Sequence, residues 1–190
     1  MFNDNWTTDE HALLIATIVK SLQSLEGEIV EIGVWEGKMT VSIANSAYPE
    51  FIHCIDWWKG NVAESEASGQ KHVTEILLET RDVKTIFEGN IKELTNQNVH
   101  LHSLDCNEWL KECTLSIKFC YLDASHDYAS VKETLELLLP RLVMGGVICG
   151  SDFLSAGNNR QDLQGGVQRA VQEILPRAKN VDNVWLYQHK

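Results

Sequence analysis

Four aspartates stand at the ends of short apolar segments in this sequence of 190 residues. Asp56, Asp105, Asp123 and Asp152 each close or follow a run that is typical of a buried β-strand. In open α/β sheets, ligands bind beyond the carboxyl ends of the parallel strands, which meet at one rim. Four carboxylates at that rim predict a mouth lined with hydrogen-bond acceptors. Such a mouth suits hydroxyl groups or a cation better than a pyrophosphate.

A turn with two glycines follows the first apolar segment. Gly33 and Gly37 lie between the strand-like run that begins at residue 29 and a helix expected over residues 38–47. Gly33 would let the backbone approach a ligand, and Gly37 would let the helix begin close to the strand. Asp56 lies 23 residues after Gly33. This is near the spacing of about 20 at which an acid accepts ribose hydroxyls in dinucleotide-binding folds. These features predict a nucleoside site.

The elements that must position these residues alternate between strand and helix patterns. Strands are expected at 29–34, 51–56, 99–103, 117–123 and 147–152, with two short segments near 181 and at 184–187. Helices are expected within 1–27 and at 38–47, 71–88, 107–113, 131–142 and 167–175, while 57–70 and 153–164 predict polar loops over the mouth. The alternation predicts one α/β domain over 1–190. Its sheet is expected to be Rossmann-like, doubly wound, mostly parallel and seven-stranded, with one antiparallel strand near an edge and helices on both faces.

The composition fits a globular protein without a nucleic-acid or membrane surface. Its net charge of −11 opposes binding to phosphate backbones and to anionic membranes. The five cysteines form no C-x-x-C pair, and their odd number fits poorly with a disulfide framework. The sequence shows no leader and no apolar run of about 18 residues. We therefore expect a cytoplasmic protein with reduced thiols.

Several segments of the sequence resemble those of a known enzyme family. They are residues 30–40, 122–132 and 140–152, and residues 165–173 and 184–187 also fit. The chain is similar there to class I S-adenosylmethionine-dependent methyltransferases. The branch is a group of small bacterial enzymes related to macrocin-type sugar O-methyltransferases and, more distantly, to catechol O-methyltransferase. The Gly-x-Gly-x-x-Gly pattern of dehydrogenases is absent.

The resemblance implies a set of residues around S-adenosylmethionine. The methionine part, the ribose and the adenine would each meet a different strand end. The residues implied are, in that order, Glu31 and Gly33, then Asp56, then Leu104 and Asp105, with Gly37, Trp57 and Asp123 completing the set. A cationic sulfonium ligand also suits an acid-lined mouth, which agrees with the reasoning from the residues alone.

The resemblance also implies catalytic and metal-binding residues. The carboxylates that match Asp123 and Asp152 hold Mg²⁺ in the resembling enzymes, and such an ion would orient an acceptor oxygen and lower its pKa. His126, three residues after Asp123, would serve as general base or as a third ligand, or else would cap its loop by hydrogen bonding. Where catechol-type enzymes have an adjacent Asp-Asn pair, this chain has Asp152 between Ser151 and Phe153. One oxygen ligand is therefore missing.

The resemblance predicts methyl transfer to a hydroxyl oxygen of a small molecule or saccharide, and two other interpretations compete with it. Tyr128 and Lys132 spell the Tyr-x-x-x-Lys pair of short-chain dehydrogenases, which would make the chain an NAD(P)-dependent reductase. The other alternative is a non-catalytic nucleoside-binding or assembly module of the same fold. Trp57 and Trp58 would stack on an acceptor, form a lid or contact a second subunit. A homodimer is one arrangement considered, and the sequence does not identify the acceptor.

Overall fold

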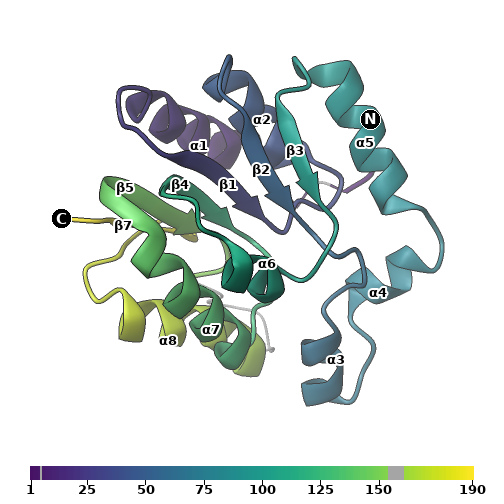
Figure 1. The fold of residues 1–190 in the computed structure, drawn as a ribbon. Coiled ribbons are helices and arrows are strands. Elements are labelled where there is room, and N and C mark those ends of the chain that lie inside the picture. The colour runs from purple at the N-terminus through teal and green to yellow at the C-terminus, as the bar shows by residue number, and fades with distance from the viewer. Residues whose placement is uncertain (5, 154–160) are drawn as a thin grey trace.

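The computed structural model describes the backbone of residues 1–4, 6–153 and 161–190 (Figure 1). At its centre lies a seven-stranded sheet with the strand order β3-β2-β1-β4-β5-β7-β6. The strands are β1 (Glu28–Ile32), β2 (Ile52–Ile55), β3 (Val99–His102), β4 (Ile117–Leu122), β5 (Leu142–Gly150), β6 (Lys179–Val181) and β7 (Val184–Gln188). Neighbouring strands from β3 to β5 are parallel, and β7 is antiparallel to β5. The mostly parallel sheet expected from the sequence is confirmed.

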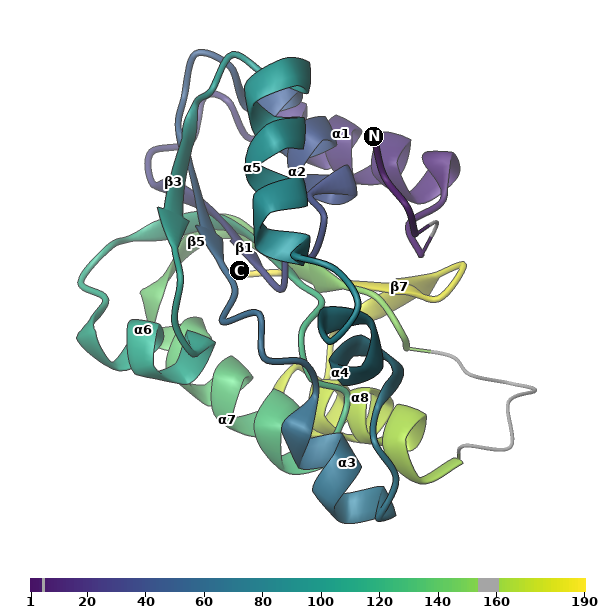
Figure 2. The same cartoon turned by 90° about the vertical axis from the view of Figure 1, so that its right-hand side faces the viewer.

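Helices cover both faces of the sheet (Figure 1 and Figure 2). They are α1 (Asp9–Ser21), α2 (Lys38–Ala47), α3 (Val62–Ser68), α4 (Val73–Leu78), α5 (Val83–Leu94), α6 (Cys106–Glu112), α7 (Tyr128–Leu138) and α8 (Gln161–Ile174), with a 3₁₀ turn η1 (Leu139–Arg141) after α7. Helices α1, α2 and α5 pack on one face, and α6, α7 and α8 pack on the other. Side chains alternate along β4, so that Phe119 and Tyr121 lie under the first group and Cys120 and Leu122 under the second. Within the described ranges, no helix has both the length and the apolar character needed to cross a bilayer.

The segment 57–88 differs from the expectation. The predicted loop 57–70 contains α3, and the predicted helix 71–88 is divided between α4 and α5. Gly69, with a left-handed φ of 67°, ends α3. Asp82 begins α5 by accepting a hydrogen bond from the Thr85 amide at 3.0 Å. Helix α3 escaped prediction because, among its described side chains, the buried one is a glutamate, Glu64, and no apolar stripe is present.

Other boundaries also differ from the expectation, and α7 spans Tyr128–Leu138 where a helix was expected over 131–142. Helix α1 ends at Ser21 and not near Gly27. Strand β5 begins at Leu142 and runs through the two glycines that were expected to precede it. These glycines lie in a register shift, because Leu142 pairs with Ile117 and Val147 with Phe119. Helix α8 begins inside the predicted loop 153–164, and residues 154–160 of that loop lie outside the described residues.

Gly33 allows the ends of β1 and β4 to approach each other closely. Its φ is 83°, and a Cβ built on it would lie 2.1 Å from the carbonyl oxygen of Asp123. The Asp123 amide donates to the Ile32 carbonyl at 2.8 Å, and the Gly33 amide donates to the Ile55 carbonyl at 2.9 Å. We expected Gly33 to make room for a ligand. The space beside its Cα is instead occupied by backbone at the end of β4.

We expect Gly33→Ala to destabilise the fold far more than Gly69→Ala. Both glycines have left-handed backbones, but nothing lies within 4 Å of a Cβ built on Gly69. Gly69→Ala should cost only the left-handed penalty of about 1–2 kcal/mol. Gly33→Ala should cost about 3 kcal/mol or more, because backbone must move as well. Urea unfolding of both variants measures the difference, and equal losses would contradict the close approach of β1 and β4.

Candidate active site

A cavity of about 780 Å³ opens at the carboxyl ends of the central strands, within the range of about 300–1,000 Å³ that is usual for small-molecule sites. Its walls also include the segment before α1, the loop that leads into α3 and the start of α4. The predicted residues that line it are Glu31, Gly33, Asp56, Trp57, Leu104, Asp105, Asp123, His126 and Asp152. The structure thus brings residues from distant parts of the chain to one rim, as a parallel sheet requires.

Two residues expected at the rim lie elsewhere. Gly37 has a φ of 85° and precedes α2, and a Cβ built on it would lie 2.9 Å from Cδ2 of Phe87 in α5. Trp58 packs on the same Phe87 with ring centroids 5.6 Å apart, and its Nε1 donates to the Trp35 carbonyl at 3.2 Å. Neither residue lines the cavity. Gly37 therefore acts on the packing between α2 and α5, and its assignment as a cofactor contact stays a prediction.

Asp56 holds the glycine turn in place. Its Oδ2 accepts hydrogen bonds from the amides of Val34 and Trp35, both at 3.0 Å, and its Oδ1 accepts one from the Trp58 amide at 2.8 Å. Burial raises the pKa of the Asp56 carboxyl, and the backbone amides oppose that rise. A carboxylate offers about four acceptor sites on its two oxygens. The three amides leave Asp56 about one acceptor site for a ligand in the cavity.

Glu31 is the most deeply buried acid of the cavity wall. It is 1% exposed, and its Oε2 has no hydrogen-bond partner among the described residues. Burial raises the pKa of this carboxyl well above its usual value, and the nearby Asp123 and Asp56 raise it further. A buried polar group without a partner is costly. A ligand with a hydrogen-bond donor or a positive charge would thus supply the partner that Glu31 Oε2 lacks.

Leu104, Asp105 and Trp57 line the other end of the cavity. Asp105 caps α6, since its Oδ1 accepts hydrogen bonds from the amides of Asn107 and Glu108 at 2.9 Å and 3.1 Å. Trp57 donates through Nε1 to a carbonyl in its own loop at 3.1 Å. These contacts hold the two loops that border this end.

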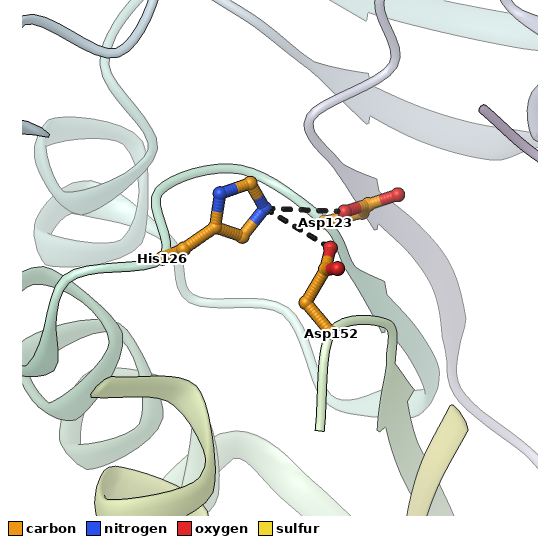
Figure 3. A group of neighbouring side chains, drawn as sticks. All are labelled: Asp123, His126 and Asp152. Atoms are coloured by element: carbon orange, nitrogen blue, oxygen red, sulfur yellow. Dashed lines mark ion pairs between the residues drawn. The ribbon is translucent and has the colours of Figure 1, made fainter. Parts of the chain in front are cut away.

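Asp123, His126 and Asp152 point toward one another at the ends of β4 and β5 (Figure 3). His126 Nε2 lies 3.3 Å from Asp152 Oδ2 and 3.7 Å from Asp123 Oδ1. One ligand atom from each of the three residues lies within 4.8 Å of the others. The Ser151 hydroxyl lies 2.5 Å from Asp123 Oδ1 and 3.0 Å from Asp152 Oδ2, so it links the two carboxylates. The three side chains form a cluster with the donor atoms of a divalent cation site.

Three carboxylates surround the His126 ring. Besides the two aspartates, Glu64 Oε1 lies 3.1 Å from His126 Nδ1 and accepts a hydrogen bond from the His126 amide at 2.8 Å. Burial opposes protonation of the ring, but the contacts with Asp123, Asp152 and Glu64 outweigh it and raise the pKa of His126 well above 6.5. His126 in turn lowers the pKa of Asp152. Burial raises the pKa of Glu64, but its contacts with His126 outweigh this and lower it overall.

Sequence reasoning missed Glu64 as a residue of the site. It belongs to α3, in the segment expected to be a loop, and is 2% exposed. The signal available was Asn61 three residues earlier, which is the spacing of a capping box. In the structure, Asn61 Nδ2 donates to Glu64 Oε1 at 2.9 Å. The polar composition of the segment concealed this helix start.

The segment before α1 was also not expected at the site. Asp4, Trp6 and Thr7 line the cavity. Trp6 stacks on Trp35 of the glycine turn with ring centroids 5.1 Å apart, and Trp35 Nε1 donates to Asp4 Oδ2 at 2.7 Å. These contacts join residues about 30 positions apart, beyond the reach of any local periodicity.

Tyr128 and Lys132 lie away from the cavity. Glu173 of α8 accepts hydrogen bonds from the Tyr128 hydroxyl and from Lys132 Nζ, both at 2.6 Å. Neither residue lines the cavity. The Tyr-x-x-x-Lys pair therefore joins α7 to α8, and the structure does not support the reductase interpretation.

Comparison with protein families identifies the sequence pattern. The model of methyltransferase family 24, described as a methyltransferase domain, matches residues 30–153. The matched region begins in β1, ends just after β5 and contains the cluster of Asp123, His126 and Asp152. No curated protein matches the sequence significantly.

Several solved structures share the fold. The O-methyltransferase TomG from Streptomyces achromogenes, solved in complex with SAM, has a TM-score of 0.69 at 14% identity, over 100% of this chain and 84% of TomG. Cofactor-bound Rv0187 from MTB has a TM-score of 0.68 at 12% identity, over 96% and 81% of the two chains. CalS11, a TDP-rhamnose 3'-O-methyltransferase of calicheamicin biosynthesis, has a TM-score of 0.60 at 17% identity, over 95% and 80%. At these identities the similarity establishes the fold alone.

We expect the contribution of His126 to stability to depend on pH in the metal-free protein. Because the pKa of folded His126 is raised above 6.5, its contribution is fully present below that pH and is lost as the pH rises through the folded value. His126→Gln removes the charge and keeps a polar side chain. The difference in unfolding free energy between wild type and variant should therefore shrink as the pH rises above about 6.5. Urea unfolding with a chelator present measures it, and a difference that grows over this range would refute the raised pKa.

Proposed function

Because the chain belongs to the methyltransferase-domain family, we propose that it transfers a methyl group from S-adenosylmethionine to a hydroxyl oxygen. The acceptor is a small molecule or a saccharide, and a divalent metal ion assists the transfer. The position of Asp123 carries the proposal. Its backbone touches Gly33 at the end of the strand that bears Glu31, and its carboxylate belongs to the cluster with His126. One cavity thus joins acids suited to the cofactor with a cluster suited to a metal.

The cofactor end of the cavity fits S-adenosylmethionine. Asp56 lines the cavity, where the acceptor site that its three backbone amides leave would serve the ribose hydroxyls. Glu31 Oε2 offers a buried acceptor to the ammonium group of the methionine part. Leu104 and Trp57 would border the adenine. S-adenosylmethionine supplies an electrophilic methyl group when it is bound. The role of the protein is to hold and orient the methyl group, because alignment of the reacting atoms accounts for much of the rate of such transfers.

The cluster also fits a divalent cation. Two carboxylates and one imidazole converge, and His126 Nε2 is buried without an aligned hydrogen-bond partner among the described residues. Asp123, Asp152 and His126 would hold the ion, while Ser151 keeps the carboxylates turned toward each other. A divalent ion there supplies Lewis-acid chemistry, which orients an acceptor oxygen and lowers the pKa of its hydroxyl.

The two roles considered for His126 make the same demand on its ring. As a general base it takes a proton at Nε2, and as a ligand it donates the lone pair of the same atom. In both roles Nδ1 must keep its proton. Glu64 Oε1, 3.1 Å away, is the acceptor for that proton.

The cavity wall also contains an exposed aromatic side chain from the segment before α1. Trp6 is 54% exposed and lines the cavity together with His72, Val73 and Thr74. An exposed tryptophan beside a pocket suits the face of a sugar or of an aromatic ring. A saccharide acceptor agrees with the name of CalS11, a TDP-rhamnose 3'-O-methyltransferase with this fold.

Calorimetric titration tests the cofactor. We expect the wild type to bind S-adenosylmethionine and not NADH. Glu31→Gln should lower the affinity about tenfold or more, because a hydrogen bond to a charged group contributes roughly 1.5–3 kcal/mol. Asp152→Asn should change it by less than about threefold, because small effects are usual for groups outside a contact.

Transfer is measured as formation of S-adenosylhomocysteine with a panel of saccharides and phenols. The wild type should methylate at least one acceptor class, and Asp152→Asn should lose that activity. A wild type that prefers NADH would refute the cofactor. Full transfer by Asp152→Asn would remove the metal from the proposal.

A further inference from the structure

We propose that Glu64 is a positioning residue that holds His126 as a nitrogen ligand, so that the cluster favours a transition-metal ion over Mg²⁺. This proposal rests on the proposed function, since it concerns the ion that assists transfer. To the proposed function it adds a role for Glu64 of α3 and the chemical class of the metal ion.

The contact between Glu64 and His126 determines which ring nitrogen faces the cluster. Glu64 Oε1 lies 3.1 Å from His126 Nδ1, and the same oxygen accepts the His126 amide at 2.8 Å. An ionised carboxylate only accepts hydrogen bonds, and Nε2 has no aligned acceptor among the described residues, so a neutral ring carries its proton on Nδ1. In the neutral ring, Nε2 then presents a lone pair toward Asp123 and Asp152. A histidine that donates its other nitrogen to a carboxylate is the usual arrangement at metal sites.

The distances around Nε2 fit an ion better than a hydrogen bond. Nε2 is buried, and no acceptor among the described residues is aligned with it. It nevertheless lies 3.3 Å and 3.7 Å from the oxygens of Asp152 and Asp123. Ligand atoms that are each about 2.0–2.2 Å from one ion lie roughly 3–4 Å from one another. His126 Nε2 thus lies at ligand spacing from both carboxylates.

Glu64 is itself held from two sides. Asn61 Nδ2 donates to its Oε1 at 2.9 Å, and His72 Nε2 lies 3.4 Å from its Oε2. These residues stand at the starts of α3 and α4. Asn61 Nδ2 also lies 3.4 Å from the Ala124 carbonyl, in the loop after Asp123. The α3–α4 segment therefore holds the Glu64 carboxylate in a fixed orientation beside Nδ1 of His126.

The donor set determines the class of ion. Mg²⁺ prefers oxygen ligands in octahedral geometry and retains several waters. Imidazole suits zinc, nickel, copper and iron better than it suits Mg²⁺. Here the two neighbours of Asp152 are Ser151 and Phe153, so neither supplies a further carboxylate or amide oxygen. His126 takes its place with nitrogen, which favours ions such as Co²⁺ or Zn²⁺.

Metal titrations without acceptor test the role of Glu64. Co²⁺ is followed by its visible absorption and Mg²⁺ by calorimetry, in metal-free wild type, Glu64→Gln and Glu66→Gln. Glu66 is an exposed glutamate of the same helix, so its variant controls for the loss of one charge. Glu64→Gln should weaken Co²⁺ binding about 10–100-fold, as removal of an outer partner of a ligand does. Mg²⁺ binding should change much less, and Glu66→Gln should leave both affinities unchanged.

A purely structural role for Glu64 predicts a different result. Distortion of the cluster would weaken both ions equally, and that outcome would overturn the proposal. Nitrogen NMR of ¹⁵N-histidine in the wild type provides a measurement that does not depend on how the variant folds. The proposal requires a protonated Nδ1 and, with Zn²⁺ added, a changed Nε2 signal. A protonated Nε2 in neutral His126, or an Nε2 signal that Zn²⁺ leaves unchanged, would overturn it.

S-adenosylmethionine binding is measured on the same samples to separate this inference from the proposed function. A protein that does not bind S-adenosylmethionine but loses Co²⁺ affinity selectively in Glu64→Gln refutes the function and supports the role of Glu64. If the protein binds S-adenosylmethionine but Glu64→Gln weakens Co²⁺ and Mg²⁺ binding equally, the proposed cofactor is supported and the role of Glu64 is refuted.

Discussion

The contact between Gly33 and the backbone of Asp123 is the constraint on which the site depends. A side chain at Gly33 would meet the Asp123 carbonyl oxygen at 2.1 Å. Because nothing separates the two strand ends, Glu31 on β1 and the Asp123 carboxylate after β4 face one cavity. The acids suited to the cofactor and the cluster suited to a metal are neighbours for this reason. The doubly wound sheet places the strand ends at one edge, and Gly33, which has no side chain, lets the ends of β1 and β4 lie in contact there.

The cost of burying charge explains how the acids of the cavity are arranged. A buried ion without a partner costs several kcal/mol. Asp56 meets this cost with three backbone amides, while Glu64 and the two aspartates of the cluster share His126. Among the described residues that line the cavity, two buried side-chain atoms have no aligned partner, Glu31 Oε2 and His126 Nε2. They lie in the two halves of the cavity that S-adenosylmethionine and a metal ion are proposed to fill.

Most of the fold could be predicted because its signals are local. Helix α2 has the expected bounds, 38–47, and β4 ends within one residue of the expected position. The errors have physical causes. Helix α3 buries Glu64 in place of an apolar stripe, so periodicity did not reveal it. Strand β5 includes Gly145, whose left-handed backbone sits in a register shift and was mistaken for a strand boundary. Gly33 also accommodates the backbone at the end of β4, a contact that the sequence did not reveal.

By itself, the sequence determined the order of strands and helices, the aspartates at the strand ends and the resemblance to methyltransferases. Hydrophobic periodicity and short motifs involve residues close together in the sequence, so they can be recognised without the structure. Only the tertiary structure decided that Glu64 stands behind His126, that Trp6 lies on Trp35 and that Tyr128 points away from the site. Hydrogen bonds, ion pairs and ring contacts act over a few ångströms between residues far apart in the chain. They leave no periodic trace, so folding must bring the partners together before they can be identified.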